Sequence, residues 1–130
     1  MFSPAEQFFV ISGVLPGHGQ GVYVLDALSG DALHILCGAT YVYDCKFVSN
    51  EDCVIHTYEP ASGFLLQLYN VKSGDLLSVL EIDMDNRVYA LASCPMKGLL
   101  AIGLMHSKLR FKVIQVKLPG KGKTAGTAKR

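Results

Sequence analysis

The 130-residue chain contains no tryptophan, and only 18% of its residues are charged. Because half of the residues are hydrophobic, this composition excludes an intrinsically disordered chain and predicts one packed domain. A long apolar run is also missing: Leu99–Met105 is far shorter than the ~20 residues that span a bilayer. The apolar stretch near the N-terminus is preceded by acidic Glu6 and by no basic residue, which argues against a secretory signal. We therefore expect a soluble cytoplasmic protein with no membrane span, and a nuclear location stays open.

The chain has no Cys-x-x-Cys pair, although it contains Cys37, Cys45, Cys53 and Cys94. Without a secretory signal, these cysteines are expected to be reduced and largely buried, with disulfides as the alternative. Cys53 and His56 resemble half of a zinc site. However, a spacing of three on one strand sends their side chains to opposite faces, and no second pair completes four ligands. The sequence therefore predicts no metal site.

Acidic residues are absent from the C-terminal end, where five of the twelve basic residues lie from Lys117 onward. Residues 1–116 hold the other basic residues and all eleven acids, so this part has no basic patch for nucleic acid. Residues 119–130 are expected to form a basic flexible tail. Its Gly122-Lys123-Thr124 lacks the upstream glycine and the following helix of a phosphate-binding loop. No specific nucleic-acid partner is predicted.

The other motifs that could carry chemistry are incomplete as well. The glycines of 17–21 have the wrong spacing for a dinucleotide-binding loop and precede a strand, so they predict a loop between two strands. Asp83 and Asp85 lack the glycine and distal glutamate of a calcium loop. No serine or cysteine forms a local nucleophile motif with any of the four histidines: His18, His34, His56 and His106. We predict no enzyme and no catalytic, cofactor or metal site, although distant residues that meet in the fold stay open.

What the sequence does contain is an internal repeat with a spacing of about 44 to 46 residues. Matching segments include a strand, a Ser-Gly-Asp turn and a second strand. This pattern aligns 22–36 with 66–80. The segment 42–43 aligns with 88–89 where the next strand opens, and 2–11 aligns with 47–56 as a strand–turn–strand element. A period of 40 to 45 residues that carries four short strands is typical of a β-propeller blade.

Runs of β-branched and aromatic residues, separated by Gly, Ser, Asn and Asp, predict an all-β fold with essentially no helix. Strands are expected near 8–13, 21–27, 32–37, 42–48, 53–58, 64–71, 76–82, 88–93, 98–104 and 108–116. Many are apolar on both sides, which predicts sheets covered on both faces by neighbouring sheets. The turns at 4–7, 49–52 and 95–98 are expected to be equivalent, and each Ser-Gly-Asp turn is expected to place its glycine at positive φ.

A strand ending in Leu25-Asp26 and followed by a Ser-Gly-Asp turn resembles the WD-repeat pattern, and Tyr69-Asn70 and Ile114-Gln115 stand at the corresponding positions. The resemblance covers residues 1–118 and implies a partial β-propeller of two to three four-stranded antiparallel blades, the first incomplete. The chain lacks the family's tryptophan and its Gly-His dipeptide. The Asp–His–Ser/Thr–Trp network of the family is therefore not carried over to any blade.

The resemblance implies a non-catalytic scaffold for protein partners. It also suggests a C-terminal part or truncated product of a larger propeller protein, such as those that join a NACHT domain to WD repeats. An enzyme or small-molecule sensor that uses a propeller channel is the alternative, and a product without independent function is a third. Because a partial propeller exposes blade faces and strand edges, we expect the chain to self-associate or to need further blades. Phe8, Phe9 and Val10 are expected to be partly uncovered.

Overall fold

The computed structural model describes residues 1–15, 19–37, 41–59, 63–80, 88–104 and 111–116. These residues form ten strands and no helix, which confirms the all-β prediction and each expected strand. The strands are β1 (Phe8–Leu15), β2 (Gly19–Asp26), β3 (Ala32–Ile35), β4 (Tyr41–Phe47), β5 (Asp52–Glu59), β6 (Gly63–Asn70), β7 (Leu76–Leu80), β8 (Val88–Cys94), β9 (Leu99–Leu104) and β10 (Phe111–Gln115). No helix in the described part of the chain has the length and apolarity needed to cross a membrane.

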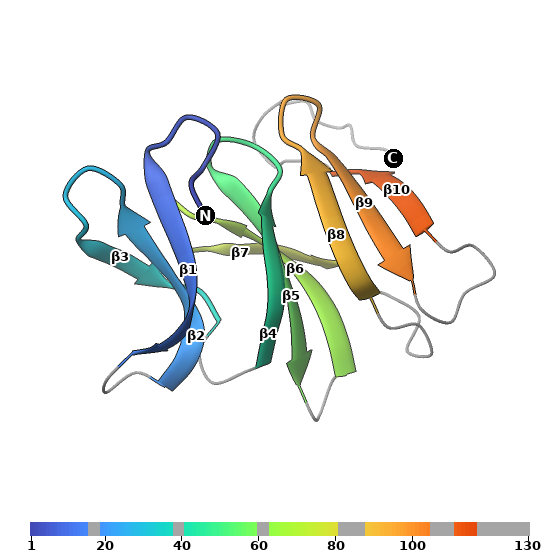
Figure 1. Cartoon of the computed structure of the whole chain (residues 1–130), viewed down its shortest axis with the longest axis horizontal. Coiled ribbons are helices and arrows are strands. Elements are labelled where there is room, and N and C mark those ends of the chain that lie inside the picture. The colour runs from blue at the N-terminus through green and yellow to red at the C-terminus, as the bar shows by residue number, and fades with distance from the viewer. Residues whose placement is uncertain (16–18, 38–40, 60–62, 81–87, 105–110, 117–130) are drawn as a thin grey trace.

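The strands form three antiparallel sheets in which each strand pairs with the next one along the chain (Figure 1). The first sheet has the order β1-β2-β3, the middle sheet β4-β5-β6-β7, and the last sheet β10-β9-β8. Short connections between neighbouring strands produce this simple meander. The three sheets do not close into a barrel within the described residues. Their assignment to a propeller stays a prediction.

The middle sheet is covered on both faces, as its doubly apolar strands predict. On one face, Ile55 packs in a cluster with Val10 and Val24 of the first sheet. On the other face, Val54 and Leu68 pack in a second cluster with residues of the last sheet. Since successive side chains of a strand point to opposite faces, β5 supplies both clusters from alternate positions. The hydrophobic core therefore consists of two layers between three stacked sheets.

The sequence repeat extends to irregularities in strand pairing. The β2–β3 register shifts between Val24 and Leu25, and the β6–β7 register shifts 44 residues later, at Leu68/Tyr69. The β4–β5 shift at Val42/Asp44 recurs in β8–β9 at Val88/Ala90. A β-bulge increases local twist. We therefore expect the bulged strands to twist alike in the two sheets that share each bulge.

The Ser-Gly-Asp turns have the predicted conformation. Gly30 and Gly74 have φ angles of 79° and 83°, in the left-handed region that glycine occupies without a Cβ penalty. The N–H of each glycine donates 2.8 Å to the carbonyl four residues earlier, that of Asp26 or Asn70. The Asp26 carboxylate also accepts 2.9 Å bonds from two backbone N–H groups of its turn, and these bonds lower its pKa.

The alignment of residues 2–11 with 47–56 is wrong by one residue. The Ser3 N–H donates to the Phe8 carbonyl, whereas the equivalent bond in the middle sheet runs from Val48 to Asp52. The first of these turns is therefore one residue longer, and it accommodates Glu6 at a φ of 59°. The sequence alignment has no gap at this turn. It therefore matches each residue of β1 to a residue of β5 that is one position away from its structural equivalent.

This shift also corrects the expectation that Phe8 and Val10 are partly uncovered. A one-residue slip moves every side chain of a strand to the other face. Both residues face the middle sheet, and Phe8 is 8% and Val10 3% exposed. Phe9 is half-buried, and the open face instead exposes Ile11 and Ile35.

Two further expectations differ from the structure. The loop expected at 16–21 is shorter, because Gly19–Gly21 already belong to β2, where they pair with Leu15, Val14 and Gly13 of β1. Cys94 is exposed, although it was expected to be buried, because it ends β8 beside a turn. The predicted features at 17–18, 83–85, 106 and 119–130 lie outside the described residues.

Candidate functional site

A groove of about 800 Å³ lies at one end of the stacked sheets. Its lining comes from all three sheets: from the turn before β1, the β4–β5 and β6–β7 turns, and the β8–β9 turn. The lining residues are Pro4, Ser49, Asn50, Glu51, Asp52, Asn70, Ser73, Leu77, Pro95 and Met96. The three turns predicted to be equivalent therefore meet at one site, because the sheets stack in the same orientation.

Asp52 is a buried residue in the lining of this groove. Asp52 is 6% exposed, and its carboxylate uses both oxygens: Oδ2 accepts a 2.7 Å bond from Ser49 Oγ, and Oδ1 accepts a 3.0 Å bond from Asn70 Nδ2. Ser49 Oγ in turn accepts from the backbone N–H groups of Glu51 and Asp52. The network ties the β4–β5 turn to the end of β6. Asp52 therefore acts as a structural link within the protein.

The groove presents apolar side chains and carboxylate oxygens close together. Met96 is 97% exposed, and Leu77 is partly buried against the cluster shared with the last sheet. Pro4 and Pro95 add rigid apolar surface, and Glu51 adds a half-buried carboxylate. This combination suits contact with a peptide or loop that carries an apolar side chain beside a basic one.

An aromatic cluster lies at the opposite end of the middle sheet, where β4 and β6 begin. Tyr43 lies 5.1 Å from His56 and 6.0 Å from Phe64, between ring centroids. Tyr58 lies 4.9 Å from Phe64 and 6.4 Å from Tyr41. Tyr41 and Tyr43 are 58% and 47% exposed. Sequence reasoning missed this cluster, since the five residues come from three strands and meet only through strand register.

Three of the four thiols gather between the first and middle sheets. Cys37 and Cys53 belong to that core cluster, and Cys45 packs against it. The Cys37 thiol donates to Tyr69 Oη at 3.4 Å. A hydrogen bond with Cys45 and burial raise the pKa of Cys53 well above its usual value. These thiols are reduced, and they fill the core as small apolar groups.

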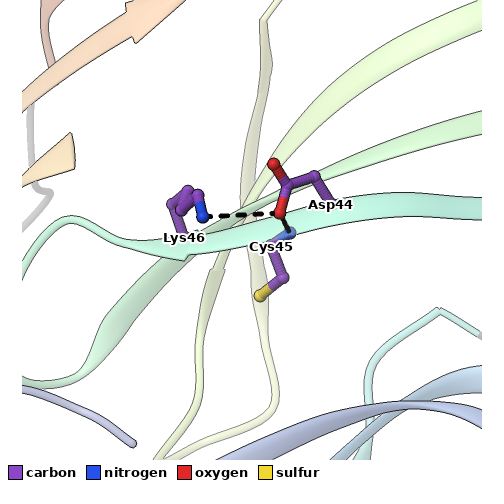
Figure 2. A network of polar contacts seen from close by, with 3 residues as sticks. All are labelled: Asp44, Cys45 and Lys46. Carbon is purple, nitrogen blue, oxygen red and sulfur yellow. Dashed lines mark hydrogen bonds and ion pairs between the residues drawn. The ribbon is translucent and has the colours of Figure 1, made fainter. Parts of the chain in front are cut away.

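The strand that carries Cys45 is held at its bulge by a neighbouring carboxylate. Asp44 Oδ1 accepts a 2.8 Å bond from the Cys45 N–H and lies 3.7 Å from Lys46 Nζ (Figure 2). Both charged side chains are about one-third exposed, so the ion pair contributes little to stability. The local bond to the backbone stabilises the bulge.

The structure separates the residues that resemble half of a metal site. Cys53 pairs with Tyr69 and faces the first sheet, whereas His56 pairs with Leu66 on the other face, as predicted. His34 Nε2 lies 2.9 Å from the Lys72 carbonyl and links the first sheet to the middle one. No group of three His, Cys, Asp or Glu side chains is arranged to hold a metal ion in the described part of the chain.

Asp52→Ala is expected to lower the free energy of unfolding by about 2 kcal/mol, because it leaves the partly buried Ser49 and Asn70 groups without their shared acceptor. Urea denaturation measures this loss. Asn50→Ala is the matched control, since Asn50 lies exposed in the same turn, and its effect should stay within about 0.5 kcal/mol. Equal losses in both variants would contradict the structural role of Asp52.

Comparison with known proteins identifies no relative: the chain matches no protein-family model, no curated protein and no solved structure.

Proposed function

We propose that the chain is a non-catalytic scaffold for protein partners, built as part of a WD-repeat-like β-propeller. The observation that carries this proposal is the groove lined by turns from all three sheets. Stacked repeats generate extended binding surfaces in this way, because each unit adds an equivalent turn to one common edge. The matching bulges and turns support the same blade-like unit in successive copies. The WD-repeat resemblance supports a larger propeller, and the location that we propose, from the lack of a signal-like charge pattern, is cytoplasmic.

The partner segment is proposed to be a short peptide or loop that places an apolar side chain on Leu77 and Met96, with a lysine or arginine near Glu51. Met96 protrudes almost fully into solvent, and a flexible thioether adapts to different apolar partners. The Asp52 network fixes the surrounding turns before binding. A fixed surface reduces the ordering cost of association.

A displayed library of random linear peptides, panned on the immobilised chain, tests this proposal. Peptides that pair apolar with basic residues are expected to be enriched, and Met96→Asp should weaken their binding at least tenfold, since it places a charge on the apolar contact. Leu28→Asp is the matched control: Leu28 is 98% exposed and does not line the groove. Its binding should equal that of the unchanged protein.

Binding that Met96→Asp and Leu28→Asp reduce equally would place the peptide elsewhere and contradict the groove as the site. A library from which no peptide is enriched would also contradict the groove as a binding site. A parallel screen of small molecules and substrates addresses the enzyme or sensor alternative. Reproducible turnover that disappears on mutation of one polar residue would overturn the scaffold proposal.

A further inference from the structure

The first sheet has an apolar face on the side away from the middle sheet. Strand register places Phe9 and Leu25 opposite each other on this face, with Ile11, Tyr23 and Ile35 beside them. Tyr23 is buried, but Ile11 and Ile35 are 42% and 46% exposed. The Phe2 ring, 57% exposed, packs edge-to-face on Phe9 at 4.8 Å and extends the face.

The last sheet also has an open face. Ala101 pairs with Val113 and with Ala92, and these side chains point away from Leu100 and Ile102, which pack on the middle sheet. Val113 is 57% exposed. The two ends of the stack therefore each expose apolar side chains.

These two faces are the two halves of an interface that the chain already forms twice. In each case one sheet packs its donating face, named here by its central residue pair, on the next sheet. The pair Val10/Val24 packs on the middle sheet, and the equivalent pair Val54/Leu68 packs on the last sheet. Ala101/Val113 is the third equivalent pair, and no described sheet lies on it.

The opposite face of each sheet, which we call its receiving face, also carries an equivalent pair of residues. Cys53/Tyr69 receives the first sheet, Leu100/Ile114 receives the middle sheet, and Phe9/Leu25 is the equivalent pair on the first sheet. The open receiving face is thus built to take a face of the kind that Ala101/Val113 presents. No pairing of two identical faces occurs between the three sheets.

We propose that a second copy of the chain docks head to tail, with the last sheet of one copy stacked on the first sheet of the next. Exposed apolar patches drive association, and the internal stacking supplies the geometry. Such an interface joins two different surfaces, so it either closes into a ring or continues to grow. The inference uses neither the groove nor its partner.

Light scattering with size-exclusion chromatography tests this assembly with two variants, Ile11→Asp on the receiving face and Val113→Asp on the donating face. The unchanged chain is expected to show at least twice its mass of 14.1 kDa. Each variant alone lacks one half of the proposed interface, so each should run as a monomer. Their equimolar mixture retains one intact pair of faces and should return to twice the monomer mass.

Leu28→Asp is the matched control, because this turn residue is 98% exposed, lies on neither face and should leave the assembly unchanged. If the unchanged chain has the mass of a monomer at about 100 μM, the proposal is wrong. It would also fail if Val113→Asp stayed assembled while Ile11→Asp became monomeric, since that pattern indicates two identical faces. Failure of the mixture to reassemble would overturn it as well. Circular dichroism checks folding, and Ile11→Ser with Val113→Ser replaces any aspartate variant that unfolds.

Discussion

Cys94 is expected to react with iodoacetamide at least about a hundredfold faster than Cys53 in the folded chain, because a thiolate must be formed and exposed for the reaction. Cys94 is exposed, whereas Cys53 is 0% exposed. The pKa of Cys53 is also raised, by its hydrogen bond with Cys45 and by burial. A raised thiol pKa keeps Cys53 neutral through neutral pH, so raising the pH to about 8 should accelerate its labelling very little.

Mass spectrometry of tryptic peptides, sampled during labelling, measures these rates. In about 6 M guanidinium chloride both cysteines should react at similar rates, which controls for intrinsic reactivity. Cys37, which is also buried, should follow Cys53. Equal labelling of Cys53 and Cys94 in buffer would mean that the first and middle sheets separate readily, and it would contradict the packing of that interface.

Strand positions could be predicted well from this sequence, since they depend on local runs of β-branched and aromatic residues. The Ser-Gly-Asp turns could be predicted equally well, because the positive φ of Gly30 and Gly74 follows from local chemistry. The pairing register of the strands was harder to predict. The extra residue in the turn before β1 carries no local signal, and this single position decides which face holds Phe8 and which holds Ile11.

The candidate site could be predicted only in part. Repeat spacing places the turns of residues 4–7, 49–52 and 95–98 in equivalent positions, but their convergence on one groove depends on how the sheets stack. The role of Asp52 was not foreseen, because its partner Asn70 lies at the end of another strand. Packing between distant segments leaves no trace in local composition, and the aromatic cluster of the middle sheet was missed for the same reason.

Gly74→Ala is expected to destabilise the chain by about 2 kcal/mol, whereas Gly30→Ala should cost only about 1 kcal/mol. Both glycines occupy equivalent turns with positive φ, so the backbone strain of a Cβ is similar in the two variants. A Cβ at Gly30 meets nothing within 4 Å, but one at Gly74 would lie 2.7 Å from His34 Nδ1. The His34 ring cannot move away without losing its contact with the Lys72 carbonyl.

The difference between the two variants therefore measures the contact between the first and middle sheets, and urea denaturation gives both free energies. His34→Ala removes the ring that the new Cβ would strike. On that background Gly74→Ala should cost no more than Gly30→Ala, while the cost of Gly30→Ala itself should not change. An undiminished cost of Gly74→Ala without His34 would show that backbone strain alone destabilises this turn. It would also mean that the first sheet does not press on the middle sheet at this position.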